Sequence, residues 1–341
     1  MATELDLRKQ EITEIDASSV ASLRLAWHKG RGSSASELVM VDPKDYGNNP
    51  DDDTGNKVYN RVKDLARTLH NFEPASDGDG PRILKCKGWY EDQAAAQFCF
   101  VYQLPPECAN HSGDVEFLTL YKAYGISKPP VGTRIRLARS LAATVLSIHE
   151  KDWLHKGIRS DRILFFPSRP GGRPNLDWPR LVGFDYARRD GPNEYSEKPI
   201  VLGNAANQTY YPEDSDKHLN LYRHPSVLRN PTTTFKKIHD YYSLGIVMVE
   251  IACWKPLASL LTKSRELQGT ECKEEDIRRV REILKRYEFP GSPVDIAFRM
   301  GNIYRQVVEV CLDGNFGASD GPCLLASFRQ RVISELDRCI I

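Results

Sequence analysis

Alternating apolar and polar positions in the first 104 residues predict a small antiparallel sheet that carries one helix. The run LRLAW is joined to ELVMV by the glycine- and serine-rich turn HKGRGSSAS, as in two strands around a loop. Two more strand-like runs cover residues 82–90 and 96–104, around a polar turn. Between these pairs, apolar residues recur at helical spacing at Val58, Val62, Leu65 and Leu69.

After Pro105 and Pro106 the pattern becomes mainly helical. Apolar residues one helical turn apart predict a long buried helix from Arg134, and residues 240–254 form the most apolar helical stretch. A further amphipathic helix is expected near residues 277–287. We therefore predict an α+β fold with a tail or short helix at 1–19, a small β lobe at 20–104 and a larger, mainly helical lobe at 105–341.

Composition narrows the classes of function. The chain has 341 residues, with 47 basic and 46 acidic side chains, so its formal charge is +1. This balance argues against nucleic acid as a partner, and no apolar run is long enough for a membrane span. The eight cysteines include no CxxC pair, which favours reduced thiols without a metal. The charged N-terminal residues do not look like a signal peptide, so a cytoplasmic location is expected.

The segment LHKGIRSDRILFF, at 154–166, resembles the catalytic loop of protein kinases, H-R-D-L-x-x-x-N. The resemblance keeps His155 but places Gly157 where the family has its catalytic aspartate. It places Arg162 where the family has a metal-binding asparagine. The spacing is kept, whereas the residues that perform the chemistry are not.

Two further motifs follow in the family's order. The family's D-F-G motif is replaced at 183–185 by Gly183, Phe184 and Asp185, so the metal-binding aspartate is lost and Asp185 is expected to point elsewhere. Asp240 matches the aspartate that opens the family's central helix, and the resemblance implies that it accepts backbone amides of the catalytic loop. His155 and Phe184 are implied to stack in the core as structural residues.

The small lobe departs from the family pattern. Asp42 falls where the family has the lysine that clamps the nucleotide phosphates, and the matching helix glutamate falls on Asp64 if Leu69 is aligned with a family leucine. Lys44 could substitute because strand side chains alternate with a period of two. However, Pro43 is expected to end the strand, so a solvated lysine is the preferred interpretation.

Other marks of the family are also altered. Gly30 and Gly32 lie too close to Asp42 for the family's phosphate-covering loop and are interpreted as an ordinary turn. The activation segment is expected at about 186–226, with Ser226 in place of the family's glutamate.

The resemblance implies a two-lobed protein-kinase-like fold without efficient phosphoryl transfer, that is, a pseudokinase. The sequences of these motifs are similar to those of kinase-like domains in filamentous fungi. Those domains follow an N-terminal helical domain in incompatibility and cell-death proteins. No such preceding domain is expected here, since the first strand is predicted at Leu23. The expected function is a protein-binding scaffold or allosteric regulator in intracellular signalling, with no cofactor and a protein partner. The candidate surfaces for that partner are the groove between lobes, residues 186–236 and a charged helix around 274–286.

Two alternatives stay open at this point. One is an atypical ATP-dependent serine/threonine kinase in which Lys44, Asp161 and Asp185 rebuild a site for magnesium and nucleotide. The other is a module that binds ATP without turnover. In both, Lys44 and Asp185 would be the cofactor-binding residues.

Overall fold

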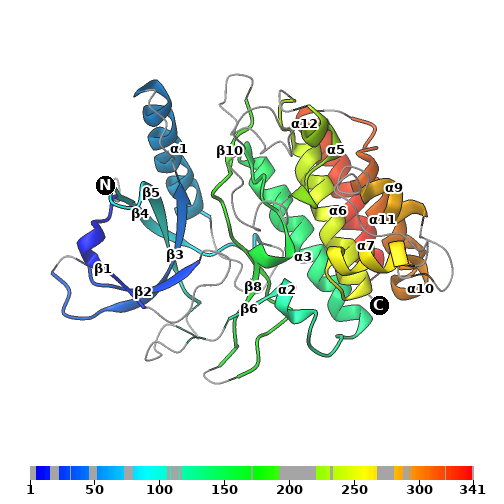
Figure 1. Cartoon of the computed structure of the whole chain (residues 1–341), viewed down its shortest axis with the longest axis horizontal. Helices are drawn as coiled ribbons and strands as arrows, with labels where there is room; N and C mark the ends of the chain where they lie inside the picture. Colours follow the sequence, from blue (N-terminus) through cyan, green and yellow to red (C-terminus); the bar gives the residue numbers. More distant parts are fainter. Residues whose placement is uncertain are drawn as a thin grey trace.

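The computed structural model describes residues 5–15, 23–30, 32–45, 52–72, 80–105, 108, 115, 117–169, 172–191, 220–230, 233–266, 280–286, 292, 294–318 and 320–339. It has an α+β fold in which a sheet and one helix lie at one end and most helices at the other (Figure 1). Within the described residues, no helix has the length and apolar character needed to cross a bilayer.

The predicted antiparallel sheet is confirmed and has five strands in the order β1-β2-β3-β5-β4. The strands are β1 (Ile12–Glu14), β2 (Arg24–His28), β3 (Glu37–Asp45), β4 (Cys86–Asp92) and β5 (Gln97–Gln103). The predicted helix is α1 (Asp52–His70), which packs against β4. Its buried positions Val58, Val62, Leu65 and Leu69 are those that the helical spacing indicated.

Strand β3 does not end at Pro43 as predicted. It continues to Asp45, and Pro43 pairs with Cys99 of β5. The pairing of β3 with β2 stops at Val41, and no other described strand pairs with that edge of β3 beyond it. A proline is tolerated at such an edge. The extension carries Lys44 onto the same strand as Asp42.

The first residues join the sheet instead of forming a tail or short helix. A single 3₁₀ turn, Lys9–Glu11, precedes β1, which pairs with β2. Leu5 and Leu7 exchange backbone hydrogen bonds with Trp89 of β4, at the opposite edge of the sheet. A Cβ at Gly88 would lie 2.3 Å from the carbonyl oxygen of Leu5, so only glycine allows this approach. The N-terminal segment thus touches both edges of the curled sheet.

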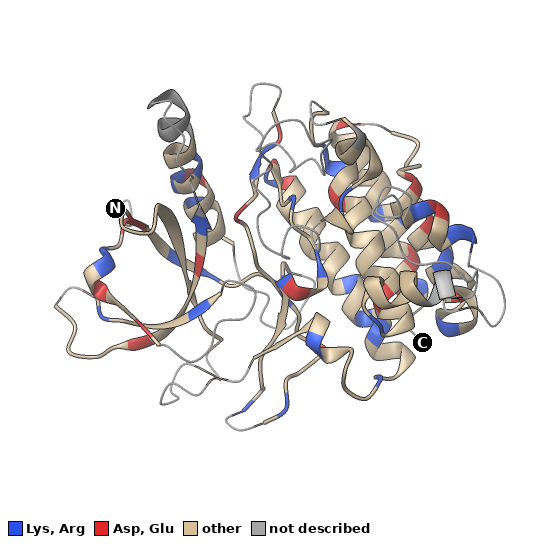
Figure 2. Cartoon of the chain, in the orientation of Figure 1, with Lys and Arg blue, Asp and Glu red and all other residues tan. Residues whose placement is uncertain are grey.

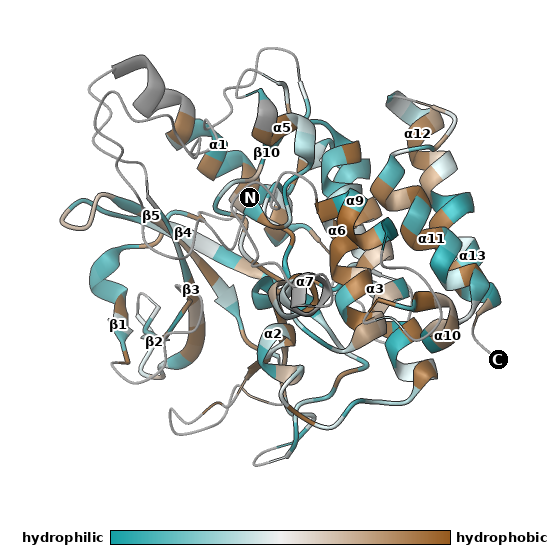
Figure 3. Cartoon of the chain, turned by 45° about the vertical axis from the view of Figure 1, so that its right-hand side comes forward, coloured by the Kyte–Doolittle hydropathy of each residue, from teal (hydrophilic) through white to brown (hydrophobic). Residues whose placement is uncertain are grey.

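The helical part is built around α6 (Lys237–Cys253), nearly all of whose residues are buried. It packs against α3 (Val131–Glu150) and α11 (Asn302–Asp313). A Cβ on Gly245 would lie 2.9 Å from the Cβ of Cys311. The absence of a side chain at Gly245 therefore allows α6 and α11 to approach closely. Figure 3 shows the apolar colour of α6 between its neighbours. The helix predicted near 277–287 is described as α9 (Val280–Arg286).

Shorter elements complete the chain. The helices are α2 (Leu120–Ala123), α5 (Pro225–Arg229), α7 (Leu257–Glu266), α10 (Ile296–Met300), α12 (Gly321–Phe328) and α13 (Ser334–Arg338), with a π-turn at Arg329–Ile333. The strands β6 (Leu118–Thr119), β8 (Ile163–Phe165) and β9 (Arg180–Leu181) form one small sheet, and β7 (Trp153–Leu154) pairs with β10 (Arg188–Arg189). These small sheets place loop 155–162, between β7 and β8, close to the segment that follows β9.

Candidate functional site

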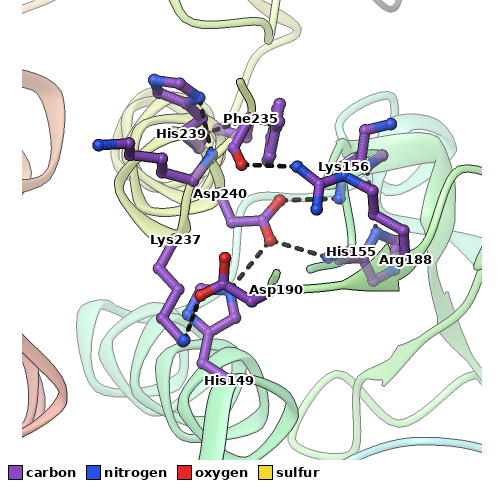
Figure 4. A network of polar contacts seen from close by, with 12 residues as sticks. His149, His155, Lys156, Arg188, Asp190, Phe235, Lys237, His239 and Asp240 are labelled. Atoms are coloured by element: carbon purple, nitrogen blue, oxygen red, sulfur yellow. Dashed lines mark hydrogen bonds and ion pairs between the residues drawn. The ribbon is translucent and has the colours of Figure 1, made fainter. Parts of the chain in front are cut away.

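The buried carboxylate of Asp240, on α6, fixes the start of loop 155–162. Its two oxygens accept the backbone N–H groups of His155 and Lys156, each at 2.8 Å, as Figure 4 shows. One oxygen also lies 2.9 Å from Nε2 of His149. Burial alone would raise the pKa of Asp240, but the hydrogen bonds with His149 and the backbone keep it below its usual value. These are the contacts that the motif implied, and they bind the loop to α6.

His155 and Phe184 connect this loop to the segment after β9. Their rings are 4.6 Å apart, and both side chains are buried. Burial lowers the pKa of His155 to about 4, because a charged imidazole would lose its hydration there. The ring is therefore neutral at physiological pH and packs as a core side chain.

Gly157 provides no acid or base at the position aligned with the catalytic aspartate. Its N–H donates to Nδ1 of His155 at 3.2 Å, and a Cβ there would lie 3.4 Å from the carbonyl oxygen of Gly183. The nearest acid along the loop, Asp161, accepts a hydrogen bond from Nε of Arg159 at 2.6 Å. Asp161 thus pairs with another side chain of loop 155–162.

Arg162, which is 5% exposed, lies between two carboxylates. Its guanidinium is 3.8 Å from an oxygen of Asp42, on β3, and 3.8 Å from an oxygen of Asp185. The other oxygen of Asp42 accepts the N–H of Gly183 at 3.2 Å. We call Asp42, Lys44, Arg162, Gly183 and Asp185 the Arg162 cluster. It joins the five-stranded sheet to the helical part of the chain.

The Arg162 side chain fills the space that a side chain at position 183 would need. Gly183 has φ +83°, and a Cβ on it would lie 2.6 Å from Cδ and 3.0 Å from Cγ of Arg162. An aspartate at Gly183 and an arginine at Arg162 therefore exclude each other in this arrangement. The residue types at positions 162 and 183 are thus sterically coupled.

The electrostatics of the cluster are governed by burial. Burial raises the pKa of Asp42 to about 6, while Arg162 counteracts the rise and Asp185 adds to it. For Arg162, burial disfavours the charged form, but Asp185 and Asp42 outweigh it and raise the pKa of the guanidinium. Arg162 thus supplies the positive charge that stabilises the two carboxylates of Asp42 and Asp185.

Lys44 and Asp185, the two candidate cofactor-binding residues, lie together, and two expectations about them were wrong. Lys44 is buried instead of solvated, and its Nζ donates to the backbone carbonyl of Asp185. Asp185 does not point elsewhere, because its carboxylate faces Arg162. The error about Lys44 follows from ending β3 at Pro43, which removed Lys44 from the face that Asp42 shares. The error about Asp185 came from its shifted place in the motif at 183–185, which does not reveal the position of Arg162.

The buried charged residue of α1 is not the one that the alignment predicted. Asp64 is partly exposed and pairs with Arg67 at 3.2 Å, so it does not face Asp42. Arg61 is 6% exposed, one helical turn before the buried Leu65. Arg61 is therefore the buried charged residue in this part of α1, and the alignment on Leu69 did not identify it.

The remaining candidates contribute little to this site. Gly30 and Gly32 lie in the turn between β2 and β3. Ser226 lies in the first turn of α5, where its hydroxyl is 2.7 Å from Nδ1 of His224. Residues 192–219 of the expected activation segment, and 274–279 of the expected charged helix, lie outside the described residues. Among the described residues, no three His, Cys, Asp or Glu side chains are grouped as a metal site would require.

Comparison with models of known protein families gives no match to this chain, and comparison with curated proteins gives none either.

Proposed function

We propose that the chain is a kinase-like pseudokinase that acts through protein binding and does not transfer phosphate efficiently. The observation that carries the proposal is the position of Arg162. If the motifs are in kinase register, the Arg162 side chain occupies the place of the metal-binding aspartate, against Gly183. Phosphoryl transfer depends on metal-borne positive charge and on positioning of the phosphates, and the register leaves neither metal ligand in place.

The order of the elements supports this register. A five-stranded sheet with one helix between its third and fourth strands precedes a helical part whose central helix carries Asp240 in its first turn. Asp240 holds the loop that contains His155, as the family's aspartate would. The parts that shape a kinase loop are thus present, while the parts that perform chemistry are replaced.

The Arg162 cluster also supports a role without nucleotide. Asp42 adds negative charge where a kinase would clamp phosphates with a lysine, and it repels a triphosphate. Arg162 lies 3.8 Å from a carboxylate oxygen of Asp42 and of Asp185, and Lys44 donates to the backbone carbonyl of Asp185. Both cations therefore already contact groups of the protein itself, which favours a role without nucleotide.

Calorimetric titration with ATP, in magnesium and again in EDTA, tests the proposal. We expect no heat of binding in either buffer. The matched variant carries Asp42→Lys, Arg162→Asn and Gly183→Asp, which together restore the family's ligands. Magnesium-dependent binding by this variant alone supports the kinase register, whereas magnesium-dependent binding by the natural chain would overturn the proposal and favour an atypical kinase or nucleotide sensor.

A further inference from the structure

Three of the five large apolar side chains that are exposed among the described residues come from adjoining segments. Phe298, on α10, is 86% exposed, Ile126 is 58% exposed and Val131 is 43% exposed. Ile126 follows α2 in a tight turn, in which its N–H donates to the carbonyl of Ala123. Val131 begins α3, which contacts α10. We call Ile126, Lys128, Val131, Phe298 and Arg299 the α3–α10 face.

Positive charges gather around Lys128, which lies between Ile126 and Val131 in the sequence. Burial is the main cause that lowers the pKa of Lys128, and Arg134, Arg299 and Lys255 lower it further. Three cations are therefore close enough to Lys128 to disfavour a fourth charge. Figure 2 shows Lys and Arg positions on the segments at this end of the helical part.

Acidic groups that could neutralise this charge are scarce. The sequence has no Asp or Glu between Glu116 and Glu150. Asp295, next to α10, is buried and accepts the N–H of Phe298 as the helix cap. Within the part of the chain that the structure describes, Lys128 and Arg299 make no hydrogen bond or ion pair, and Nε of Arg299 is buried without a partner.

We propose that the α3–α10 face binds the surface of an anionic membrane. Phe298 would enter the boundary between head groups and acyl chains, flanked by Ile126 and Val131, while Lys128 and Arg299 contact anionic head groups. Peripheral attachment of this kind combines buried apolar area with attraction between cations and anionic lipid. The exposure of Phe298 favours lipid over a protein partner, since a side chain with so few neighbours can enter a bilayer without a complementary pocket.

Sedimentation with vesicles tests the assignment. The probes are vesicles of phosphatidylcholine alone and of phosphatidylcholine mixed with phosphatidylserine, at low and at physiological ionic strength. We expect binding only to the vesicles that contain phosphatidylserine, and weaker binding in salt because exposed charges are screened. Phe298→Ala should reduce the partition coefficient about tenfold or more, and Lys128→Ala about fivefold.

The matched control is Tyr59→Ala, which removes an exposed aromatic side chain from α1, at the other end of the molecule. Its partition should equal that of the natural chain, and circular dichroism should show that all variants are folded. Equal binding of the natural chain and Phe298→Ala would overturn the proposal. Absence of binding to either vesicle at low ionic strength would also overturn it, and would leave an acidic protein as the ligand of the same cations.

Discussion

Replacing Arg162 by alanine is the perturbation that tests the Arg162 cluster most directly. At 3.8 Å and an effective dielectric constant of about 20, each carboxylate contact of Arg162 corresponds to about 4 kcal/mol of attraction. The contact with Asp185 is the weaker one, because that side chain is partly exposed. Removing one partner of a buried pair typically costs about 3–5 kcal/mol, since the other charge stays buried. We expect Arg162→Ala to lower the free energy of unfolding by that amount at pH 8.

The pH dependence separates this cause from a simple loss of packing. The pKa of Asp42 is already raised to about 6, and without Arg162 it should rise further. A raised carboxyl pKa gives stability that is complete at low pH and is lost as pH rises through the pKa in the folded state. Arg162→Ala should therefore be less destabilising at pH 5.5 than at pH 8.

Denaturation in urea at both pH values provides the measurement, and Asp42→Asn provides the partner for a double-mutant cycle. In the Asp42→Asn background, Arg162→Ala should cost much less at pH 8, because no buried charge is left behind. An equal cost in both backgrounds and at both pH values would refute the reasoning and reduce Arg162 to a space-filling side chain.

Three further predictions concern neighbouring residues. Gly183→Ala should lower the free energy of unfolding by about 2 kcal/mol or more, because alanine disfavours the positive φ and its Cβ would clash with Arg162. Denaturation in urea should show a smaller cost when Arg162→Ala is also present. Asp240→Asn should lower the free energy of unfolding by about 3 kcal/mol in the same assay, because its charge-assisted hydrogen bonds are weakened. The control Asp64→Asn, at a partly exposed residue, should change stability by less than about 0.5 kcal/mol. Equal losses in the two variants would contradict the role of Asp240. Because burial lowers the pKa of His155 from 6.5 to about 4, the fold should lose stability as pH falls through that window, and a His155→Leu variant that loses as much would exclude this cause.

The elements of the fold could be predicted where one periodicity dominates. The spacing of Val58 to Leu69 predicted α1, and the apolar run after Asp240 predicted α6. The extension of β3 past Pro43 could not be predicted, because it depends on where β2 stops pairing. Which charged residue of α1 is buried was misjudged, because the prediction depended on aligning Leu69 alone and the buried face of the helix also includes Arg61.

The sequence predicted some residues of the site but not how those residues contact one another. The resemblance to a kinase drew attention to residues 42, 162 and 183 one at a time. The structure brings Arg162 into contact with Asp42 and Asp185 and against Gly183, so these residues act together. Residues 42, 162 and 185 are far apart in sequence, and their contact is set by packing between the sheet and the helical part. No local pattern carries that information.

The N-terminal segment has a consequence for the order of folding during synthesis. β1 pairs with β2, and Leu5 and Leu7 bond to Trp89 of β4. The segment is made before β2 and β4, yet one of its two binding edges does not exist until residues 86–92 have emerged from the ribosome. Residues 5–7 are thus among the last of the sheet to be fixed, although they precede its five strands in the sequence. Until then, both edges of the sheet stay open to pairing with another chain.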